Sequence, residues 1–562
     1  MSEHLCSAAL VAALLTSAGC SQPAPAPQDV SAVDVVYHGG SIWTGVAGAE
    51  RAAALAIRDG IIVYAGSSEE ALARAGAGTV RVDLGGAFVV PGFVDNHTHF
   101  LSGGFGLAGV ELRDAATPEE FAGRIAAFAA TLPDGRWILN GDWDHELWGG
   151  TLPDRTWIDE ATAATPVFVT RLDGHMGLAN SRAMELAGVS AETTSPAGGE
   201  IVRDADGRAT GIFKDTAMDL IGAAITPLSA SEYDRALDAA QRHALALGVT
   251  QIHDMAGDGW RSLEAFRRAH DDGRLAVRVY SFVPLADWRR MAEYVESHGR
   301  GDERLRWGAV KGFVDGSLGS TTAWFYEPYD DAPATRGFAI TDLEELKADI
   351  AGADAAGLHV AVHAIGDRAN DWLLAAYSEI AGAETARRRF RVEHAQHLSR
   401  AAIARFAALG VIASMQPYHA IDDGRWAEKR IGPERIRTTY AFADLLAAGA
   451  TLTFGSDWTV APLDPLVGVY AAVTRRTLDG ANPDGWVPDQ KITVEHALGA
   501  YTAANAYAGF REATAGTLEA GKAADFVVLS ADLFAIDPVA IPEVTVLATV
   551  IAGEAVYEAD GS

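Results

Sequence analysis

The sequence of 562 residues is poor in cysteine, lysine and positive charge. It has two cysteines, and because Cys6 lies in a segment that we expect to be removed, the mature chain has no intrachain disulfide. The 45 Lys and Arg residues against 75 Asp and Glu residues give a net charge of −30. Phosphate binding needs the opposite sign, so nucleic acid and an anionic membrane face are excluded as main partners.

Long apolar runs are also missing. The apolar run near the start of the chain, residues 8–19, is too short to span a bilayer. It is typical of a signal-peptide core, and Ser17-Ala18-Gly19-Cys20 resembles a bacterial lipoprotein cleavage box. We therefore predict a signal peptide over residues 1–19, a lipid anchor on Cys20 and a Pro-Ala tether over residues 20–33. The protein would be exported to the periplasm or cell envelope.

Two departures leave an alternative open for this leader. Ser17 stands where lipoprotein boxes usually have leucine, and the first six residues contain no Lys or Arg. The alternative is an ordinary cleaved signal peptide followed by an incidental cysteine.

The rest of the chain has the composition of a large folded protein, with 49% hydrophobic residues. Both ends, residues 34–90 and 510–562, contain short apolar runs punctuated by Gly, which is an all-β pattern. We expect these two ends to form one small composite β-sandwich.

The middle, residues 91–509, alternates apolar strands with Ala-rich helical segments, a pattern typical of parallel β/α units. Eight strands can be counted, at residues 93–97, 249–253, 276–282, 309–314, 359–363, 390–394, 411–415 and 452–455. The predicted fold is therefore α/β: a TIM-type (β/α)8 barrel whose chemistry lies at the C-terminal strand ends. Residues 101–234 are too many for one connection, so we predict an inserted subdomain after strand one that covers the site.

Potential metal ligands stand where several of these strands end. His97 and His99 are two residues apart, so on a strand they project to the same side. His363, His394 and Asp457 end or follow strands five, six and eight. A single barrel histidine is usually structural, but imidazoles and a carboxylate gathered at one barrel mouth predict a divalent metal site.

Lys311 lies within the apolar strand four, and it is one of six lysines in the chain. Burial favours the neutral amine, which can react with carbon dioxide to give a carbamate, an anionic donor able to bridge two cations. The alternative is a lysine paired with a carboxylate such as Asp315.

The ordered set of His-x-His, Lys, His, His and Asp resembles the amidohydrolase superfamily of metal-dependent hydrolases, and within it amidohydrolase family 3, which includes the N-substituted formamide deformylases. The stretches that carry the resemblance are Val89-Val90-Pro91-Gly92-Phe93-Val94-Asp95-Asn96-His97-Thr98-His99, Asp315-Gly316-Ser317-Leu318-Gly319-Ser320, Val362-His363-Ala364-Ile365-Gly366-Asp367, Glu393-His394-Ala395-Gln396 and Gly455-Ser456-Asp457-Trp458. Gly141-Asp142-Trp143-Asp144, Arg171-Leu172-Asp173-Gly174-His175 and Gly521-Lys522-Ala523-Ala524-Asp525 are also similar to that family, so the match spans roughly residues 34–560.

The resemblance implies one or two divalent ions, most simply zinc, with His97 and His99 on one ion and His363 and His394 on the other. It implies that Lys311, carboxylated, bridges them and that Asp457 is both ligand and proton carrier. The expected activity is hydrolysis of a non-peptide carbon–nitrogen bond, in an amide, formamide or cyclic amide, by metal-activated hydroxide with Asp457 as proton shuttle. Deamination and lactone or ester hydrolysis would use the same site, and an unmodified Lys311 would leave room for a single metal.

Substrate-binding candidates come from the insertion and from the segment after strand four. They are Trp143, His145, Asp173, His175 and Ser317, because an aromatic wall with a few polar groups suits a small organic ligand. Packing of the tryptophan and helix capping by Ser317 or Ser320 are the alternatives. We expect His359 to be structural and His397 and His419 to support ligands or touch substrate, while the role of His253 stays open.

These motifs are compatible with two classes of function. The first is an exported hydrolase with a small-molecule substrate, no nucleic-acid partner and membrane contact only through Cys20; a homodimer is compatible with it. The second is a non-catalytic surface protein on the same scaffold. The second class is disfavoured because all six expected ligand positions are filled, and metal analysis would discriminate the two.

Overall fold

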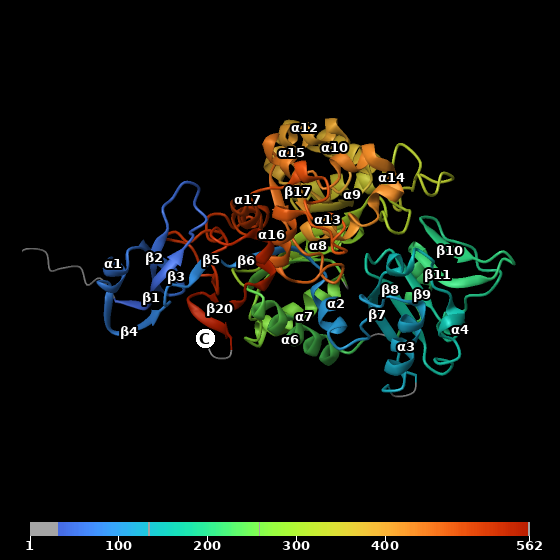
Figure 1. Ribbon diagram of the computed structural model, residues 1–562, viewed down its shortest axis with the longest axis horizontal. Helices are drawn as coiled ribbons and strands as arrows, with labels where there is room; N and C mark the ends of the chain where they lie inside the picture. The colour runs from blue at the N-terminus through green and yellow to red at the C-terminus, as the bar shows by residue number, and fades with distance from the viewer. Residues whose placement is uncertain (1–31, 133–134, 227, 258, 560–562) are drawn as a thin grey trace, which may run out of the picture.

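A computed structural model describes residues 32–132, 135–226, 228–257 and 259–559. Three parts lie side by side along its long axis (Figure 1): a sheet built from both chain ends, a central barrel, and a second sheet from the inserted segment. The predicted signal peptide and Cys20 lie outside the described residues. Within the described ranges no helix is both long and apolar enough to cross a membrane.

The central part is an eight-stranded parallel barrel, as the alternation of strands and helices predicts. Its sheet runs from the first to the last barrel strand, and an isolated parallel bridge between Thr98 and Trp458 links the two ends. The strands are β6 (Phe93–Thr98), β12 (Val249–Met255), β13 (Arg278–Pro284), β14 (Leu305–Phe313), β15 (His359–Ala364), β16 (Arg391–His394), β17 (Ile412–Met415) and β18 (Leu452–Phe454).

Most barrel-strand residues are buried on both faces, which is why these strands are near-continuous apolar runs rather than alternating ones. Helices cover the outside of the barrel, and the first of them, α6, begins with a capping box between Ser229 and Glu232. The helices outside the strands are α6 (Ala230–Ala246), α7 (Trp260–Asp271), α8 (Trp288–His298), α9 (Leu343–Ala355), α10 (Asp367–Ala381), α11 (Thr385–Arg388), α12 (Arg400–Leu409), α15 (Phe442–Ala447), α16 (Pro465–Thr474), α17 (Val494–Tyr501) and α18 (Ala503–Ala508).

The segment between α2 (Phe100–Gly106) and α6 has its own five-stranded sheet and its own core. Trp143 and Phe121 are fully buried in that core. The strand order is β10-β11-β9-β8-β7, with strands β7 (Ile138–Trp143), β8 (Val167–Arg171), β9 (Met176–Ala179), β10 (Gly199–Arg203) and β11 (Ala209–Asp215) and helices α3 (Pro118–Ala129), α4 (Ser181–Leu186) and α5 (Asp219–Gly222).

The third part joins strands from both chain ends in one eight-stranded sheet. β5 pairs with β1 on one side and with β19 on the other, so the two ends meet through hydrogen bonds. Tyr37, Leu55, Phe526 and Val550 share one buried cluster. The elements are β1 (Val33–Ile42), β2 (Ala52–Arg58), β3 (Ile61–Gly66), α1 (Ser68–Leu72), β4 (Ala75–Asp83), β5 (Phe88–Pro91), β19 (Phe526–Leu529), β20 (Val546–Ile551) and β21 (Glu554–Glu558).

Candidate metal centre and substrate cavity

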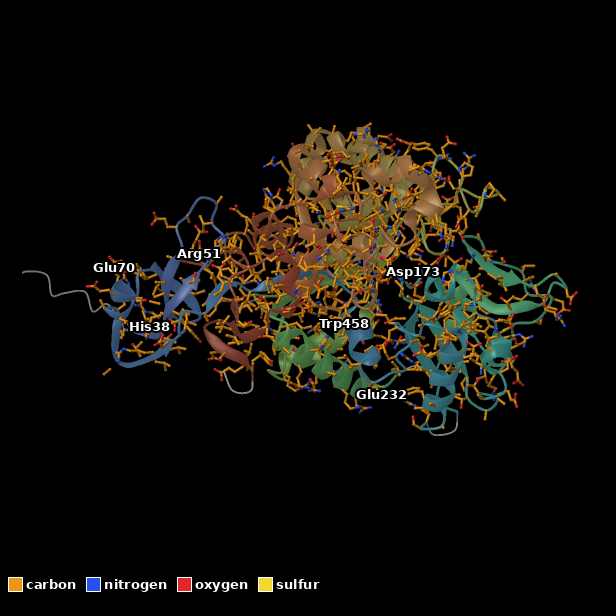
Figure 2. All side chains as sticks on the ribbon, in the orientation of Figure 1. His38, Arg51, Glu70, Asp173, Glu232 and Trp458 are labelled. Atoms are coloured by element: carbon orange, nitrogen blue, oxygen red, sulfur yellow. The ribbon has the colours of Figure 1, made fainter. Side chains whose placement is uncertain are left out.

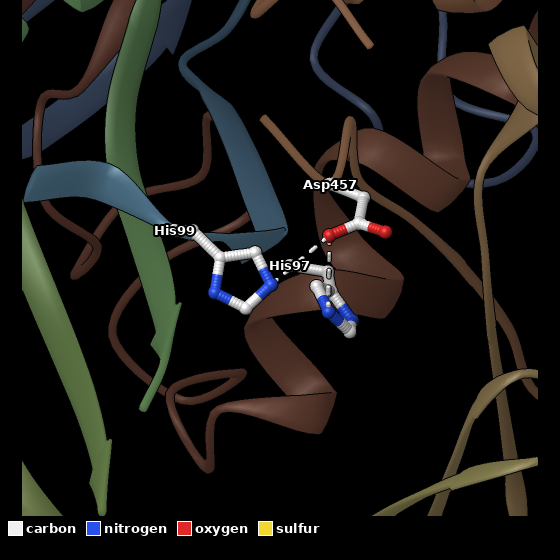
Figure 3. Close-up of side chains that lie close together, drawn as sticks. All are labelled: His97, His99 and Asp457. Carbon is white, nitrogen blue, oxygen red and sulfur yellow. Dashed lines mark ion pairs between the residues drawn. The ribbon is translucent and has the colours of Figure 1, made fainter. Parts of the chain in front are cut away.

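The ends of β6 and β18 bring His97, His99 and Asp457 together (Figure 3). Asp457 Oδ1 lies 3.4 Å from His97 Nε2 and 3.3 Å from His99 Nε2. Backbone bonds hold the two segments in register, because the Asp457 amide donates to the His97 carbonyl and the His99 amide to the Trp458 carbonyl, each at 2.7 Å. The three side chains therefore offer ligand atoms to one point at the barrel mouth.

Two of the predicted ligands have positive φ angles, 74° for His394 and 59° for Asp457. Non-glycine residues rarely adopt this conformation, and it accumulates where a site constrains the backbone. His394 is the last residue of β16, so this conformation ends the regular alternation in which Arg391 and Glu393 face the inside of the barrel. Its ring lies beside those of His97 and His363.

His363 and His394 complete a row of imidazoles. The ring centroid of His394 lies 4.8 Å from that of His97 and 4.6 Å from that of His363. His394 Nδ1 donates to Gln416 Oε1 at 2.8 Å, and His363 Nε2 donates to the Gly316 carbonyl at 3.0 Å. Each ring thus keeps one nitrogen lone pair, on His394 Nε2 and His363 Nδ1, with which it can bind a cation.

Lys311 is 2% exposed, and its Nζ lies 3.5 Å from His97 Nε2. Burial lowers the pKa of its amine to about 8. The Asp315 carboxylate, its alternative partner, instead accepts the backbone amides of Trp324, Ile365 and Gly366 at 2.7–2.9 Å. The lysine is thus placed beside the imidazoles with an amine that is easier to deprotonate than usual.

The electrostatics of the cluster suit a divalent cation. Burial lowers the pKa of His97 to about 4 and holds those of His363 and His394 well below the usual range. Burial alone would raise the pKa of Asp457, but the imidazoles around it, His97 foremost, bring it well below its usual range. Neutral imidazoles around an ionised carboxylate are the protonation states that metal ligands need.

Buried polar atoms without hydrogen-bond partners also indicate a cation site. Asp457 Oδ1 and His419 Nε2 are buried and have no hydrogen-bond partner among the described residues. A second group of potential ligands, His394, His419 and Asp457, shares the carboxylate with the first. Buried lone pairs without donors cost free energy unless a cation takes them up, so the residues present fit a metal centre.

A narrow cavity of about 50 Å³ opens beside this cluster. His363, His394, His419 and Asp457 line one side, and Asp173, His175 and Ser317 line another. Figure 2 shows Asp173 where the inserted segment meets the barrel. The apolar part of the wall comes from Leu172, Leu318, Ile365, Trp426 and Val460.

Sequence comparison agrees with this geometry. The profile described as "Amidohydrolase family" matches residues 81–557, most of the chain. The chain belongs to the amidohydrolase family. It is an amidohydrolase, a metal-dependent hydrolase on a TIM-type barrel, and its His and Asp cluster is the candidate site for the divalent metal.

Individual relatives cover nearly the whole amidohydrolase chain. Protein LONG AFTER FAR-RED 3 of Arabidopsis thaliana is 39% identical over 93% of this chain and 91% of its own. The N-substituted formamide deformylase of Arthrobacter pascens is 28% identical over 91% of this chain and 96% of its own. The crystal structure of an uncharacterized metal-dependent hydrolase from Pyrococcus horikoshii OT3 is 30% identical, with a TM-score of 0.73, and covers 90% of this chain and 99% of that one.

Glu393 is a site residue of this amidohydrolase to which the sequence pattern assigns no role, although it lies within one of the family motifs. His97 Nδ1 donates to Glu393 Oε2 at 2.6 Å, which leaves His97 Nε2 free to face Asp457. Arg391 donates to both oxygens of the same carboxylate, at 2.6 and 3.0 Å, and Ser414 donates at 2.6 Å. Glu393 therefore fixes the tautomer and orientation of His97.

The structure does not bring Trp143 and His145 to the cavity. Trp143 is fully buried in the core of the inserted segment and donates its indole N–H to the Val169 carbonyl at 2.9 Å. His145 Nδ1 accepts a hydrogen bond from Arg171 Nε at 3.3 Å, and Arg171 in turn binds Asp173 and Asp144. Both residues shape the insertion, and His145 contacts Arg171, which does line the cavity.

The remaining histidines lie deeper or beside the site. His253 contacts Arg391 beneath the cluster, and His359 bonds to Tyr280 and to the Arg389 carbonyl. His397 bonds to Thr439. Among the other candidates, Ser317 donates to Asp173 Oδ2, as Ser320 does at 3.3 Å, so both serines position that carboxylate.

Proposed function

We propose that this amidohydrolase hydrolyses a non-peptide carbon–nitrogen bond of a small amide, formamide or cyclic amide. The observation that carries the proposal is the position of Asp457, a buried carboxylate within 3.4 Å of two imidazoles and on the wall of the cavity. The similarity to an N-substituted formamide deformylase supports this choice of bond.

His97, His99, His363, His394 and Asp457 would hold one or two divalent ions, and we propose zinc because nitrogen ligands predominate. A bound cation of this kind supplies Lewis acidity, which polarises a carbonyl and makes a water molecule easier to deprotonate. Lys311, carboxylated, would add an oxygen ligand between the two halves of the site.

The role of Asp457 follows from its charge. As an ionised carboxylate at neutral pH, it takes one proton from the water that adds to the carbonyl carbon. When the carbon–nitrogen bond breaks, the same proton passes to the departing nitrogen, so the products are a carboxylic acid and an amine. Arg171, Asp173 and Ser317 line the same cavity as Asp457.

Metal analysis and an amide screen test the proposal. We expect at least one equivalent of zinc in the purified protein and hydrolysis of members of a panel of N-formyl, N-acyl and cyclic amides. Asp457→Asn should lower kcat by about 100- to 10,000-fold, whereas Asp271→Asn, a change of an exposed carboxylate on α7, should leave kcat unchanged. Less than a tenth of an equivalent of metal, or equal activity of both variants, would contradict it.

The carboxylated lysine has a test of its own. Lys311→Ala should lower the number of bound metal ions, and short carboxylic acids should restore activity by occupying the space that the carbamate would fill. Unchanged metal content in the variant would show that Lys311 does not bridge.

We also propose export and lipid anchoring through Cys20, supported by the apolar leader and the cleavage-box resemblance. Cells grown with labelled palmitate should yield labelled protein, and Cys20→Ser should abolish the label. A label that survives this substitution would contradict the anchor.

A further inference from the structure

The inside of the barrel holds a line of hydrogen-bonded polar side chains below the metal centre. Barrels of this type are usually filled by branched apolar residues, whereas here Arg391, Glu393 and His253 are all fully buried. Strands β16 and β12 are four places apart in the eight-stranded sheet, so their inward-facing side chains face each other across the barrel. Arg391 on β16 reaches across and donates from Nη1 to His253 Nδ1 on β12 at 3.0 Å.

The direction of this hydrogen bond follows from the chemistry of arginine. A guanidinium group only donates, so His253 Nδ1 is the acceptor. The other guanidinium nitrogens, Nε and Nη2, donate to Glu393, Ser414 and the Asn96 carbonyl at 2.6–3.1 Å. His253 therefore supplies the acceptor for Nη1, and without it this nitrogen would have no hydrogen-bond partner among the described residues, which is costly for a buried charged group.

Glu393 carries the effect of this contact to a metal ligand. Its two oxygens accept from Arg391 at 2.6 and 3.0 Å, and its Oε2 also accepts from His97 Nδ1 at 2.6 Å. His253 thus holds the arginine, the arginine holds the carboxylate, and the carboxylate orients the His97 ring. A shift of the guanidinium would move the carboxylate and release that ring from its orientation.

The ring of His253 is itself held in place. It packs edge-to-face on Tyr280, with ring centroids 5.4 Å apart and an interplanar angle of 89°. Below it, a Cβ on Gly509 would lie 2.9 Å from His253 Nε2, so any larger residue there would press on the ring. The Gln251 amide lies between His253 Nε2, at 3.1 Å, and Arg511 Nη1, at 2.7 Å. These contacts keep Nδ1 turned toward the opposite strand.

We propose that His253 is a positioning residue for the metal centre: by holding Arg391 against Glu393, it fixes His97 in the orientation that binds the cation. This inference concerns the metal centre, and it holds whichever bond the enzyme hydrolyses. It gives a role in metal binding to a histidine that touches neither the metal ligands' side chains nor the cavity wall in any described contact.

The experiment measures metal affinity by removing metal from the full chain and titrating it with Zn²⁺ against a chelator. His253→Leu is apolar and cannot accept from the guanidinium, so we expect affinity to fall by about 3- to 30-fold. His253→Asn should retain most of the affinity, because its Oδ1 takes the place of Nδ1. Wild-type affinity in His253→Leu, or an equal loss in His253→Asn, overturns the inference.

A spectroscopic measurement reports the geometry directly. With Co²⁺ in place of Zn²⁺, the visible absorption of His253→Leu should differ from that of the wild type and of His253→Asn, because the His97 ring is less firmly oriented. Should His253→Leu not fold, His253→Phe provides a ring that also lacks an acceptor, and the same results are expected of it. Identical spectra for the wild type and the apolar variant overturn the inference.

A double variant tests whether His253 acts through Glu393. If it does, adding His253→Leu to Glu393→Gln should change metal affinity by less than about twofold, because the connection to His97 is already broken. If His253→Leu lowers affinity by the same factor in both backgrounds, then it does not act through the carboxylate and the inference is wrong.

Strand β15 offers a matched control in His359, which is 4% exposed and also faces the inside of the barrel. It bonds to Tyr280 Oη at 3.2 Å and to the Arg389 carbonyl at 2.8 Å. His359→Leu should lower the free energy of unfolding but leave metal affinity and the Co²⁺ spectrum as in the wild type. If His359→Leu weakens metal binding as much as His253→Leu, then loss of any core histidine has this effect and the inference is wrong. Neither result depends on amide turnover, so the proposed function stands or fails separately.

Discussion

At the scale of single residues, the site depends on how each imidazole is held. His97 is bonded through Nδ1 to a carboxylate that is itself saturated by Arg391 and Ser414. We expect Glu393→Gln to weaken metal binding by about 10- to 100-fold. The neutral amide makes His97 Nε2 a weaker metal ligand and leaves the ring less firmly oriented. Competition with a chelator of known affinity measures the change.

The control for this substitution is Glu200→Gln, a change at a half-exposed residue that pairs with Lys214 in the inserted segment. It should leave metal affinity as in the wild type. If Glu393→Gln binds metal as tightly as Glu200→Gln, then the carboxylate does not support the ligand.

These residues also mark what the sequence could and could not predict. The pairing of His97 and His99 could be predicted from the sequence, because strand periodicity is a local pattern that places residues two apart on one side. The same rule puts Glu393 and His394 on opposite faces, and it fails at His394, whose φ of 74° departs from the extended strand. The support of His97 by Glu393 depends on residues 296 positions apart meeting in space, which no local pattern encodes.

At the scale of elements, the turn between β8 and β9 carries the insertion's contribution to the cavity. Arg171 ends β8 with its side chain 1% exposed and bonds to Asp144 at 3.1 Å and Asp173 at 2.7 Å. Arg171→Met would leave the buried carboxylate of Asp173 without its arginine partner and that of Asp144 with Arg425 alone. We expect a loss of about 3–5 kcal/mol in the free energy of unfolding, measured by urea denaturation.

An exposed pair in the same segment serves as the comparison. Arg182 and Glu185 are three residues apart on α4 and 37% and 71% exposed. Arg182→Met should change the free energy of unfolding by less than about 1 kcal/mol, because surface pairs contribute little. Equal effects of the two substitutions would mean that Arg171 is not buried as the structure has it.

Element types were more predictable than the environment of their side chains. The eight barrel strands follow from apolar runs of strand length separated by helical segments, because strands that are buried on both faces are near-continuous apolar runs. The aromatic stretch around Trp143 could equally have lined a cavity or filled a core. It fills the core, because β7 turns that side chain toward Phe121 and the Val169 carbonyl.

At the scale of the whole molecule, the two added parts sit at opposite ends of the barrel (Figure 1). The inserted segment meets the C-terminal strand ends, where Asp144 and Glu146 pair with Arg425 and Arg430 at 3.0–3.1 Å. The sheet made by the chain ends meets the opposite side, where Arg278 at the start of β13 binds Asp525 through both carboxylate oxygens, at 2.6 and 2.9 Å. Barrels of this kind keep chemistry at one end and stability at the other.

The ion pair between Arg278 and Asp525 predicts how the free energy of unfolding changes as the pH falls. Burial would raise the pKa of Asp525, but the hydrogen bonds and charge of Arg278 lower it below its usual value. A carboxyl group with a lowered pKa stabilises the folded state fully above its unfolded-state pKa of about 3.9 and loses this contribution as the pH falls through the folded-state value. Asp525→Asn should therefore cost about 3–5 kcal/mol at pH 7.

Urea denaturation at a series of pH values measures this effect as a difference between the wild type and the variant. The gap between their unfolding free energies should stay constant from neutral pH down to about 5 and shrink below about pH 4, because protonation of Asp525 removes the same charge that the substitution does. Asp532→Asn, which breaks the partly exposed pair with Arg51 beside the same sheet, should cost less than about 1 kcal/mol at every pH. A gap for Asp525→Asn that is as small as this, or that widens on acidification, would mean that the charge of Asp525 does not hold the terminal sheet to the barrel.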